Sequence, residues 1–336
     1  MSEPMPSEPF EEATCVAEGV WALPMPFPSP LAHVYAYAVR QADGVTLIDA
    51  GWDSDEAWEA LLAGLSKAEV TLADLSSVLI THIHPDHYGL VSRLREHTDL
   101  TVQMHPLEAS RIQHDPAYPE AAIGDMVSWL EVVGAPEEEI DALRSDAPRI
   151  KSRFFSHSPD VQLEDGAVGV DAGGIQAIHT PGHTPGHLTF YEPEREVLFT
   201  GDHVLPRISP NVSKRPENGE DPLGDFVDSL RKVKQLRIRV GLPGHEWPMP
   251  DLPGRLETLL THHDERMRDV EFAVRDGART VWQVASTIRW SRPWSQLRGL
   301  SRRSAIGEAH AHLERLAQEG RLERTRGTPD RWSVAG

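Results

Sequence analysis

The segment Thr81 to Gly89 constrains this chain more than any other part of its sequence. It reads Thr-His-Ile-His-Pro-Asp-His-Tyr-Gly and follows Val78-Leu79-Ile80, an apolar run typical of a buried strand. Three histidines and one carboxylate fall within six residues, and neutral imidazole and carboxylate are the usual ligands of Zn²⁺ and similar divalent ions. A lone histidine is usually a core or surface residue, but this cluster at a strand end predicts a metal site.

The spacing within the segment suggests ligands for two ions. An extended backbone points alternate side chains to the same side, so His82 and His84 can reach one ion together. The chain then turns at Pro85, which leaves Asp86 and His87 free to serve a second ion.

Ligand-type residues also follow three later predicted strands. They are His179, His183 and His187 after one strand, Asp202 and His203 after another, and His245 after a third. Neighbouring glycines let the backbone turn sharply and approach closely. Because ligands at the ends of several strands converge in one crevice, where open α/β sheets place their sites, we expect these segments to meet the first cluster in one pocket.

Apolar strands and helical stretches alternate along most of the chain, which favours an α/β fold. Strands are predicted at 33–39, 45–48, 78–80, 102–104, 175–178, 188–191, 197–199 and 238–242, and helices at 54–66 and 224–235. Residues 115–160 interrupt this rhythm and predict two or three inserted helices. Met126, Trp129 and Leu130 could form an apolar wall for an acyl chain.

The last part of the chain differs in composition. Residues 275–336 hold 12 Arg, no Lys and 6 acidic residues, a net charge of +6. Helical periodicity at 280–289 and 304–318, followed by a hairpin around Gly327, has a winged-helix outline. We predict a small α+β domain over residues 266–336, with a homodimer through it as one possibility.

Charge and terminal composition limit the function classes. The net charge of −19 argues against nucleic-acid binding, which needs clustered Lys and Arg.

Cysteine content and the N-terminal composition bear on the compartment. The single cysteine, Cys15, allows no internal disulfide. Residues 1–16 predict a disordered acidic lead-in with neither the basic start nor the apolar run of a signal peptide. No apolar stretch reaches the ~20 residues of a membrane span, so we expect a cytoplasmic protein with a small-molecule substrate.

The segment His82 to His87 resembles the HxHxDH signature of the metallo-β-lactamase superfamily, and the later motifs follow in the same order over about residues 17–265. The implied fold is a four-layer αββα sandwich. The segments around His183 and Asp202 resemble the glyoxalase II group, and the tail resembles the winged-helix tail of lactamase-B-like hydrolases, a branch that includes an endoribonuclease. The resemblance implies one ion on His82, His84 and His183, a second on Asp86, His87 and His245, and Asp202 bridging both.

This chemistry predicts hydrolysis of a thioester or ester, including lactones, by a water activated between two ions. Zn is the expected metal, although Fe and Mn suit the same ligands. Asp86 and Asp202 would offset the positive charge of the ions, and Tyr88 could donate a hydrogen bond to the developing oxyanion.

Two alternative functions stay open: a phosphodiesterase acting on RNA, and a winged-helix DNA-binding regulator with a metal-sensing domain. β-Lactamase activity is not expected without periplasmic targeting.

Several other residues are predicted to orient the ligands or to contact the substrate. Asp49, at the end of an early strand, is expected to hold a ligand histidine, and His179 and His187 to orient His183. His203 could contact substrate. The family often continues Gly-His-Gly after the last ligand, but here Glu246 and Trp247 follow and could alter the mouth of the site. The remaining nearby histidines are expected to be structural or surface residues: His105, His114, His262 and His263.

Overall fold

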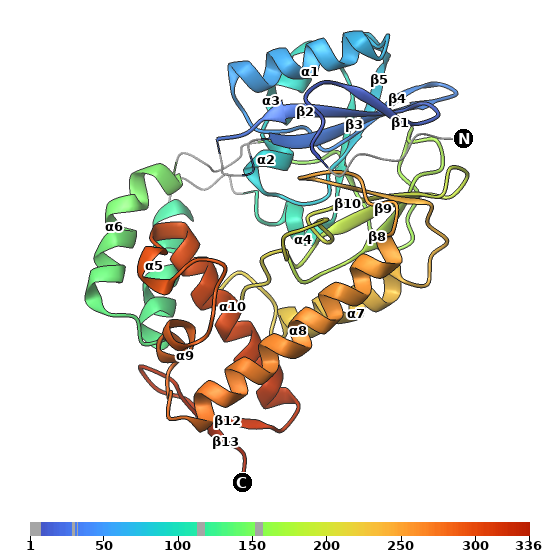
Figure 1. Cartoon of the computed structure of the whole chain (residues 1–336). Helices are drawn as coiled ribbons and strands as arrows, with labels where there is room; N and C mark the ends of the chain where they lie inside the picture. Colours follow the sequence, from blue (N-terminus) through green and yellow to red (C-terminus); the bar gives the residue numbers. More distant parts are fainter. Residues whose placement is uncertain (1–7, 29–30, 32, 113–117, 152–156) are drawn as a thin grey trace.

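Two β-sheets face each other in the upper half of the molecule (Figure 1). The computed structural model describes residues 8–28, 31, 33–112, 118–151 and 157–336. The first sheet has the order β1 (Thr14–Ala17), β2 (Val20–Pro26), β3 (His33–Gln41), β4 (Gly44–Ile48), β5 (Leu75–Leu79), β6 (Thr101–Met104), β7 (Val161–Gln162). The second has the order β11 (Val240–Pro243), β10 (Val197–Gly201), β9 (Leu188–Glu192), β8 (Gln176–His179).

The two sheets pack through large apolar side chains that alternate with outward-facing residues along each strand. Tyr37 and Leu79 from the first sheet share one buried cluster with Phe190 and Phe199 from the second. The Tyr37 hydroxyl also donates to the carbonyl of Pro243 at 2.6 Å. Because β4, β5 and β6 run parallel, their carboxyl ends meet at one edge, which is where the candidate ligands begin.

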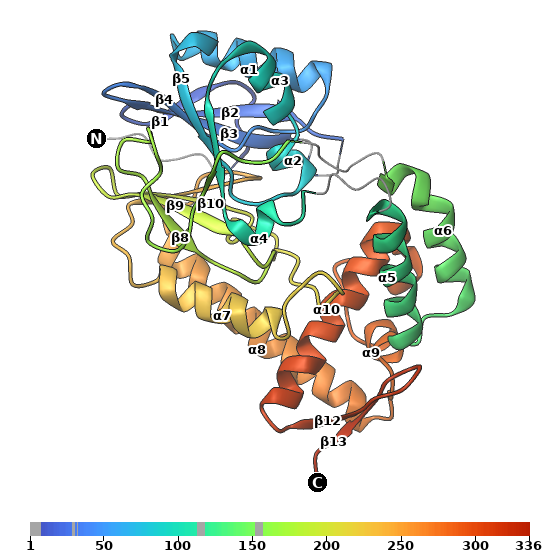
Figure 2. The same cartoon turned by 180° about the vertical axis from the view of Figure 1, so that it is seen from behind.

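Helices cover the outer face of each sheet, as Figure 2 also shows. On the first sheet lie α1 (Asp55–Lys67) and α3 (Val91–His97), whose buried leucines join the strand side chains. Ser54 starts α1 because its hydroxyl accepts the backbone N–H of Ala57 at 3.1 Å. Under the second sheet lie α7 (Pro222–Val233) and α8 (Leu252–Arg275). This layer order confirms the predicted αββα sandwich.

A second body, the helical lobe, lies beside and below the sandwich (Figure 1). It consists of α5 (Tyr118–Val132), α6 (Glu137–Lys151), α9 (Val281–Thr287), α10 (Gly299–Gln318), β12 (Leu322–Thr325), β13 (Arg331–Val334) and the C-terminal half of α8. Short helices complete the fold: α2 (Pro85–Tyr88), α4 (Pro106–Ala109), and two 3₁₀ turns at Leu72–Asp74 and Trp294–Gln296.

The inserted helices and the tail share one core. Trp129 and Leu130 of α5 are buried with Ile306 and Leu313 of α10, and the Trp129 indole donates to His310 Nδ1 at 3.2 Å. The expectation that Trp129 and Leu130 line an acyl pocket is therefore wrong. An amphipathic helix shows that one face is buried, but not what covers it.

Two predicted boundaries fall inside regular elements. Residues 14–16, assigned to the acidic lead-in, belong to β1 and pair with β2, so the lead-in is too long as predicted. Residues 265 and 266 lie within α8, which runs unbroken from Leu252 to Arg275. The division into two domains and the homodimer stay predictions. Among the described residues, no helix combines the length and apolarity needed to cross a membrane.

Candidate metal centre

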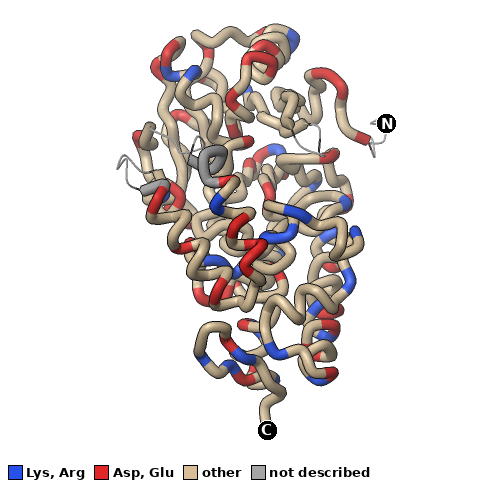
Figure 3. Tube along the Cα trace, turned by 90° about the vertical axis from the view of Figure 1, so that its left-hand side faces the viewer, with Lys and Arg blue, Asp and Glu red and all other residues tan. Residues whose placement is uncertain are grey.

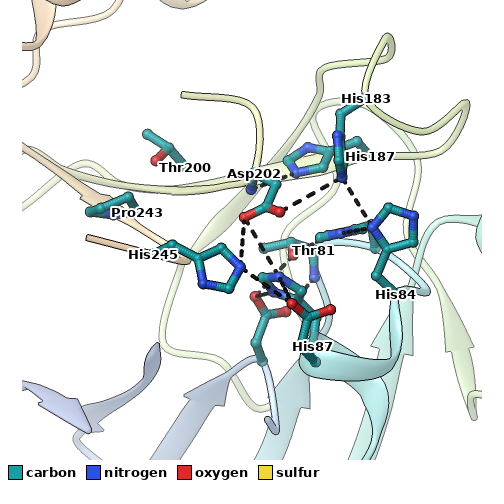
Figure 4. A network of polar contacts seen from close by, with 12 residues as sticks. Thr81, His84, His87, His183, His187, Thr200, Asp202, Pro243 and His245 are labelled. Carbon is teal, nitrogen blue, oxygen red and sulfur yellow. Dashed lines mark hydrogen bonds and ion pairs between the residues drawn. The ribbon is translucent and has the colours of Figure 1, made fainter. Parts of the chain in front are cut away.

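Seven side chains from four strand ends meet at the edge of the two sheets, as Figure 4 shows for most of them. His82 and His84 lie in the loop after β5, and Asp86 and His87 lie on the short helix α2 that follows. The other three follow β8, β10 and β11: His183, Asp202 and His245. Three overlapping groups drawn from these residues have ligand atoms within 4.8 Å of one another.

The first group consists of three imidazoles. His82 Nε2 lies 2.9 Å from His84 Nδ1, and His183 Nε2 lies 3.1 Å from the same His84 nitrogen. Three ring nitrogens this close to one point match the donor set of a histidine-bound Zn²⁺. This is the set that the sequence resemblance implied for one ion.

The second group combines a carboxylate with two imidazoles. Asp86 Oδ2 lies 3.3 Å from His245 Nε2 and 3.9 Å from His87 Nε2. All three side chains are buried or nearly so, with Asp86 at 9% exposure and His87 at 0%. A polar group buried this deeply needs a partner, and a cation would supply one.

Asp202 lies between the two groups (Figure 4). Its Oδ2 is 3.7 Å from His183 Nε2, while its Oδ1 is 3.6 Å from both His87 Nε2 and His245 Nε2. Asp202 Oδ1 and His87 Nε2 are buried and have no hydrogen-bond partner among the described residues. Such orphaned atoms are rare in folded proteins unless an ion or water completes them, so these residues fit a pair of cations.

The outer nitrogens of these histidines fix which nitrogen faces the centre. His183 Nδ1 lies 2.9 Å from the carbonyl oxygen of Asn211, and His245 Nδ1 lies 2.9 Å from that of His33. A carbonyl only accepts hydrogen bonds, so each Nδ1 must carry the proton. In the neutral ring, each Nε2 then has a lone pair directed at the centre, as a metal ligand requires.

Asp49 fixes the other side of the centre. Its Oδ2 lies 2.7 Å from His87 Nδ1 and accepts the Thr81 hydroxyl at 2.9 Å, while its Oδ1 accepts the Thr81 backbone N–H at 2.8 Å. The Thr81 hydroxyl in turn lies 2.9 Å from His82 Nδ1. The sequence predicted Asp49 as a partner of a ligand histidine, and the structure places it on His87.

Electrostatics separates the imidazoles into two kinds. Burial alone would lower the pKa of His87 and of His245, but the neighbouring aspartates outweigh it and raise the pKa of both rings. Burial, together with neighbouring histidines, holds the pKa of His82 and of His84 well below the ordinary value, so both rings are neutral. Burial alone would raise the pKa of Asp202, but His245 and His87 hold it well below its usual range. The carboxylates are therefore ionised and supply negative charge where cations would lie.

Gly244 permits the close approach of β11 to this centre. A Cβ atom at Gly244 would lie 2.6 Å from His87 Cε1 and 2.8 Å from Asp202 Oδ1. Any side chain there would displace a ligand-type residue, which explains why glycine precedes His245.

Glu108, on α4, is a supporting residue that sequence reasoning missed. It is fully buried, and its Oε2 accepts the Ile83 backbone N–H at 2.9 Å while its Oε1 accepts that of Gly186 at 2.8 Å. It thus ties the loop of His82 and His84 to the loop of His183. In the sequence, Glu108 is marked only by its place just after a predicted buried strand, and a carboxylate at that place could equally have faced solvent.

Replacing Glu108 with glutamine is expected to destabilise the fold by about 1–3 kcal/mol, because the amide NH₂ must face one of two buried N–H donors. Urea unfolding of the metal-loaded protein measures this. Glu192→Gln is the matched control, since buried Glu192 accepts the Arg195 backbone N–H at 2.7 Å and the amide oxygen can still accept it. The Arg195 guanidinium lies further away, at 3.6 Å from the same oxygen. An equal effect of both substitutions would contradict the tie between the two loops.

The remaining predicted residues fall into supporting or distant places. Tyr88 is buried, and its hydroxyl donates to the His157 carbonyl at 2.8 Å. Donation to a substrate oxyanion would require that bond to break, and its catalytic role stays a prediction. His203 is fully buried against Phe226, at 5.0 Å between ring centroids. Burial lowers its pKa to about 3, so the ring is neutral and packed behind Asp202.

Of the two histidines that flank His183, only one contacts the ligand cluster. His187 lies 5.1 Å from His82 between ring centroids, and its Nε2 accepts the Asp202 backbone N–H at 3.2 Å. His179 instead stacks on His105 at 4.3 Å. His262 and His263 belong to α8, and His114 lies outside the described residues.

Glu246, which stands where the family often has glycine, binds the loop after β10. Its carboxylate accepts the backbone N–H groups of Arg207 and Ile208 at 2.9 and 3.2 Å and the Arg207 Nε at 3.0 Å. The Arg207 guanidinium also lies over the Trp247 ring, at 5.7 Å from its centroid. The two residues therefore hold the loop after β10.

Comparisons with known proteins agree with this geometry. The probable metallo-hydrolase YqjP of Bacillus subtilis (strain 168) is 27% identical over 278 residues, covering 81% of this chain and 85% of the relative. The atrochrysone carboxyl ACP thioesterase of Aspergillus fumigatus is 27% identical over 301 residues, but this chain spans only 57% of that protein's length.

Solved structures show the same architecture over nearly the whole chain. A metallo-beta-lactamase family protein from Thermus thermophilus is 30% identical with a TM-score of 0.79, covering 95% of this chain and 100% of that one. A beta-lactamase domain protein from Burkholderia ambifaria is 26% identical with a TM-score of 0.80, covering 96% and 94%. The family model for the metallo-beta-lactamase superfamily matches residues 30–245, which include all seven clustered side chains, and the chain belongs to that superfamily.

Proposed function

We propose that this metallo-hydrolase cleaves a thioester or ester, including lactones, at a centre of two divalent ions. The position of Asp202 carries the proposal, because its two oxygens face two separate groups of imidazoles. One ion would be held by His82, His84 and His183, the other by Asp86, His87 and His245, with Asp202 shared.

The chain's own residues prepare this centre. Divalent ions held there would supply Lewis acidity, which lowers the pKa of a bound water to about 7 and polarises a substrate carbonyl. Asp86 and Asp202 offset the positive charge, and the acceptors behind His87, His183 and His245 hold one proton of each ring on its outer nitrogen. Zn²⁺ is the metal we expect, and Fe or Mn would suit the same donors.

An apolar wall beside the second group supports an acyl substrate. The Phe27 ring lies 5.8 Å from the His245 ring and 5.4 Å from the Trp52 ring. These two aromatic rings therefore lie on the His245 side of the centre. The thioesterase relative from Aspergillus fumigatus supports the thioester class.

The nucleic-acid alternatives find less support. The candidate recognition helix, α10, buries residues on most of its turns, including His310, His312 and Glu314. It could not enter a DNA groove without leaving the core of the helical lobe. On the face seen in Figure 3, acidic segments are interleaved with basic ones, which does not favour tracking a phosphate backbone.

A substrate panel tests the proposal. The metal-loaded protein would be assayed with an acyl thioester, an acyl ester, a lactone, a chromogenic β-lactam and single-stranded RNA. We expect thioester or ester turnover that disappears with a chelator, returns with Zn²⁺ and is insensitive to salt, because no polyanion is bound. Turnover of RNA alone, falling steeply with salt, would overturn it.

A further inference from the structure

Three arginines, called the arginine cluster here, act through their charge on one another or on the first group of histidines. Arg111 follows α4, Arg215 lies in the loop between β10 and α7, and Arg303 lies on α10. The positive charge of Arg111 is close enough to His84 to lower the pKa of that imidazole. Arg303 and Arg111 in turn both lower the pKa of Arg215, although burial is the larger cause. The cluster thus includes one residue whose charge reaches a candidate ligand, Arg111, and one that lies on α10, Arg303.

Backbone contacts hold Arg215 against α10. The Lys214 backbone N–H donates to the Gly307 carbonyl at 2.9 Å, and Arg215 Nη2 donates to the Ser304 hydroxyl at 3.1 Å. A Cβ atom at Gly307 would lie 3.5 Å from Arg215 Nε. Since Arg303 precedes Ser304 and lies one turn before Gly307, both guanidinium groups are held near the same part of α10.

The loop that carries Arg215 also supports a candidate ligand. The Asn211 carbonyl accepts from His183 Nδ1, and the Asn211 side chain accepts from the Ser213 hydroxyl at 2.5 Å. Residues 211–215 therefore connect the metal centre to the arginine cluster.

The cluster has more buried positive charge than its neighbours neutralise. Arg303 is 6% exposed and donates from Nη2 to Asp146 Oδ2 at 3.0 Å, but its Nη1 has no partner among the described residues. The Nε of Arg215 is likewise buried without a partner in the described part of the chain. Glu217 is the acidic residue whose charge raises the pKa of Arg215.

The unpartnered donors point to a missing anion. Guanidinium keeps its charge at any physiological pH, and its planar set of donors matches carboxylate and phosphate oxygens. Leaving such a charge buried without a partner is costly. A bound anion would satisfy both the free N–H groups and the surplus charge.

We propose that Arg111, Arg215 and Arg303 bind an anionic group of the substrate, a carboxylate or a phosphate, while the scissile bond lies at the candidate metal centre. This deepens the proposed function and rests on it. The anion has two possible sources: a carboxylate on the acyl part, or the phosphate of a phosphopantetheine thiol.

The test compares three thioesters on the zinc-loaded protein. Butyryl-N-acetylcysteamine is neutral, glutaryl-N-acetylcysteamine adds an acyl carboxylate, and butyryl-4′-phosphopantetheine adds a phosphate on the thiol side. We expect one charged substrate to have a clearly lower KM than the neutral one. Arg215→Gln should raise that KM at least about tenfold more than the KM of the neutral substrate, because a charge-assisted hydrogen bond is lost.

Arg302→Gln is the matched control on the same helix. Arg302 also has a buried Nε without a partner among the described residues. Its charge, however, is paired with Glu139 and lies over the rings of Trp282 and Trp294, so it is compensated outside the cluster. It should change stability without changing the preference for the charged substrate. Arg215→Gln should leave the unfolding midpoint equal or higher, since it removes an unpaired buried charge.

Direct binding separates this proposal from the proposed function. Glutarate or inorganic phosphate should raise the melting temperature of the zinc-loaded wild type more than that of Arg215→Gln at equal metal content. That result supports the anion site even if no thioester is cleaved. Equal shifts in both proteins, no KM preference, or a lower stability of Arg215→Gln with unchanged KM would overturn it.

Discussion

Replacing Asp202 with alanine is expected to lower the metal content from two ions per chain toward one. It should also reduce kcat/KM by at least about 1,000-fold, because a water held by a single ion in a disrupted site loses much of its activation. The reason is geometric: Asp202 is the residue whose two oxygens face both groups of imidazoles. Metal analysis by mass spectrometry and steady-state kinetics on the best thioester or ester measure the two effects.

A second buried aspartate provides the control for this substitution. Asp330 is 6% exposed and accepts the Gly327 backbone N–H at 2.7 Å in the C-terminal hairpin. Asp330→Ala should lower stability but retain both ions and wild-type kcat/KM. Two ions and wild-type turnover in Asp202→Ala would show that Asp202 does not bridge.

Asp49→Asn is expected to weaken binding of the second ion by about 10- to 100-fold, the usual effect of losing the partner of a ligand histidine. Asparagine keeps the shape and tolerates the positive φ of 59° at this position. Its NH₂ group, however, must face either the Thr81 backbone N–H or His87 Nδ1. In the second case His87 carries its proton on Nε2 and can no longer bind a metal.

Titration of the metal-free variant with Zn²⁺ measures this change. Asp160→Asn is the control, because Asp160 also accepts a backbone N–H, from Val102 at 2.8 Å, outside the ligand cluster. We expect Asp160→Asn to bind both ions with wild-type affinity. If Asp49→Asn bound both ions as tightly as the wild type, the hydrogen bond to His87 would not set the ligand's tautomer.

The parts of the site that the sequence predicted are those with local signals. His82, His84, Asp86 and His87 lie in one short segment whose strand and turn fix their directions. Strand ends and neighbouring glycines marked the later segments, but His187 also follows a glycine, and only the family resemblance singled out His183. Asp49 was predicted as a partner by its position at the end of a strand, but its choice of His87 depends on the packing of β4 beside β5.

The supports that the sequence did not reveal depend on tertiary contacts. The carbonyls of His33 and Asn211 hold two ligand histidines, and any residue type offers a carbonyl. Glu108 binds two loops that are distant in sequence. Trp129 was misjudged for a related reason: helical spacing indicated a buried face, but its partner, His310 of α10, lies 181 residues further along the chain.

The most direct test of the central claim is anomalous diffraction at the zinc absorption edge from crystals of the zinc-loaded protein. We expect two peaks. One lies about 2.0–2.2 Å from nitrogens of His82, His84 and His183, and the other at the same distance from Asp86, His87 and His245. Asp202 should contribute one oxygen to each. A single peak, or a peak elsewhere with these seven side chains unbound, would contradict a centre of two ions at these residues.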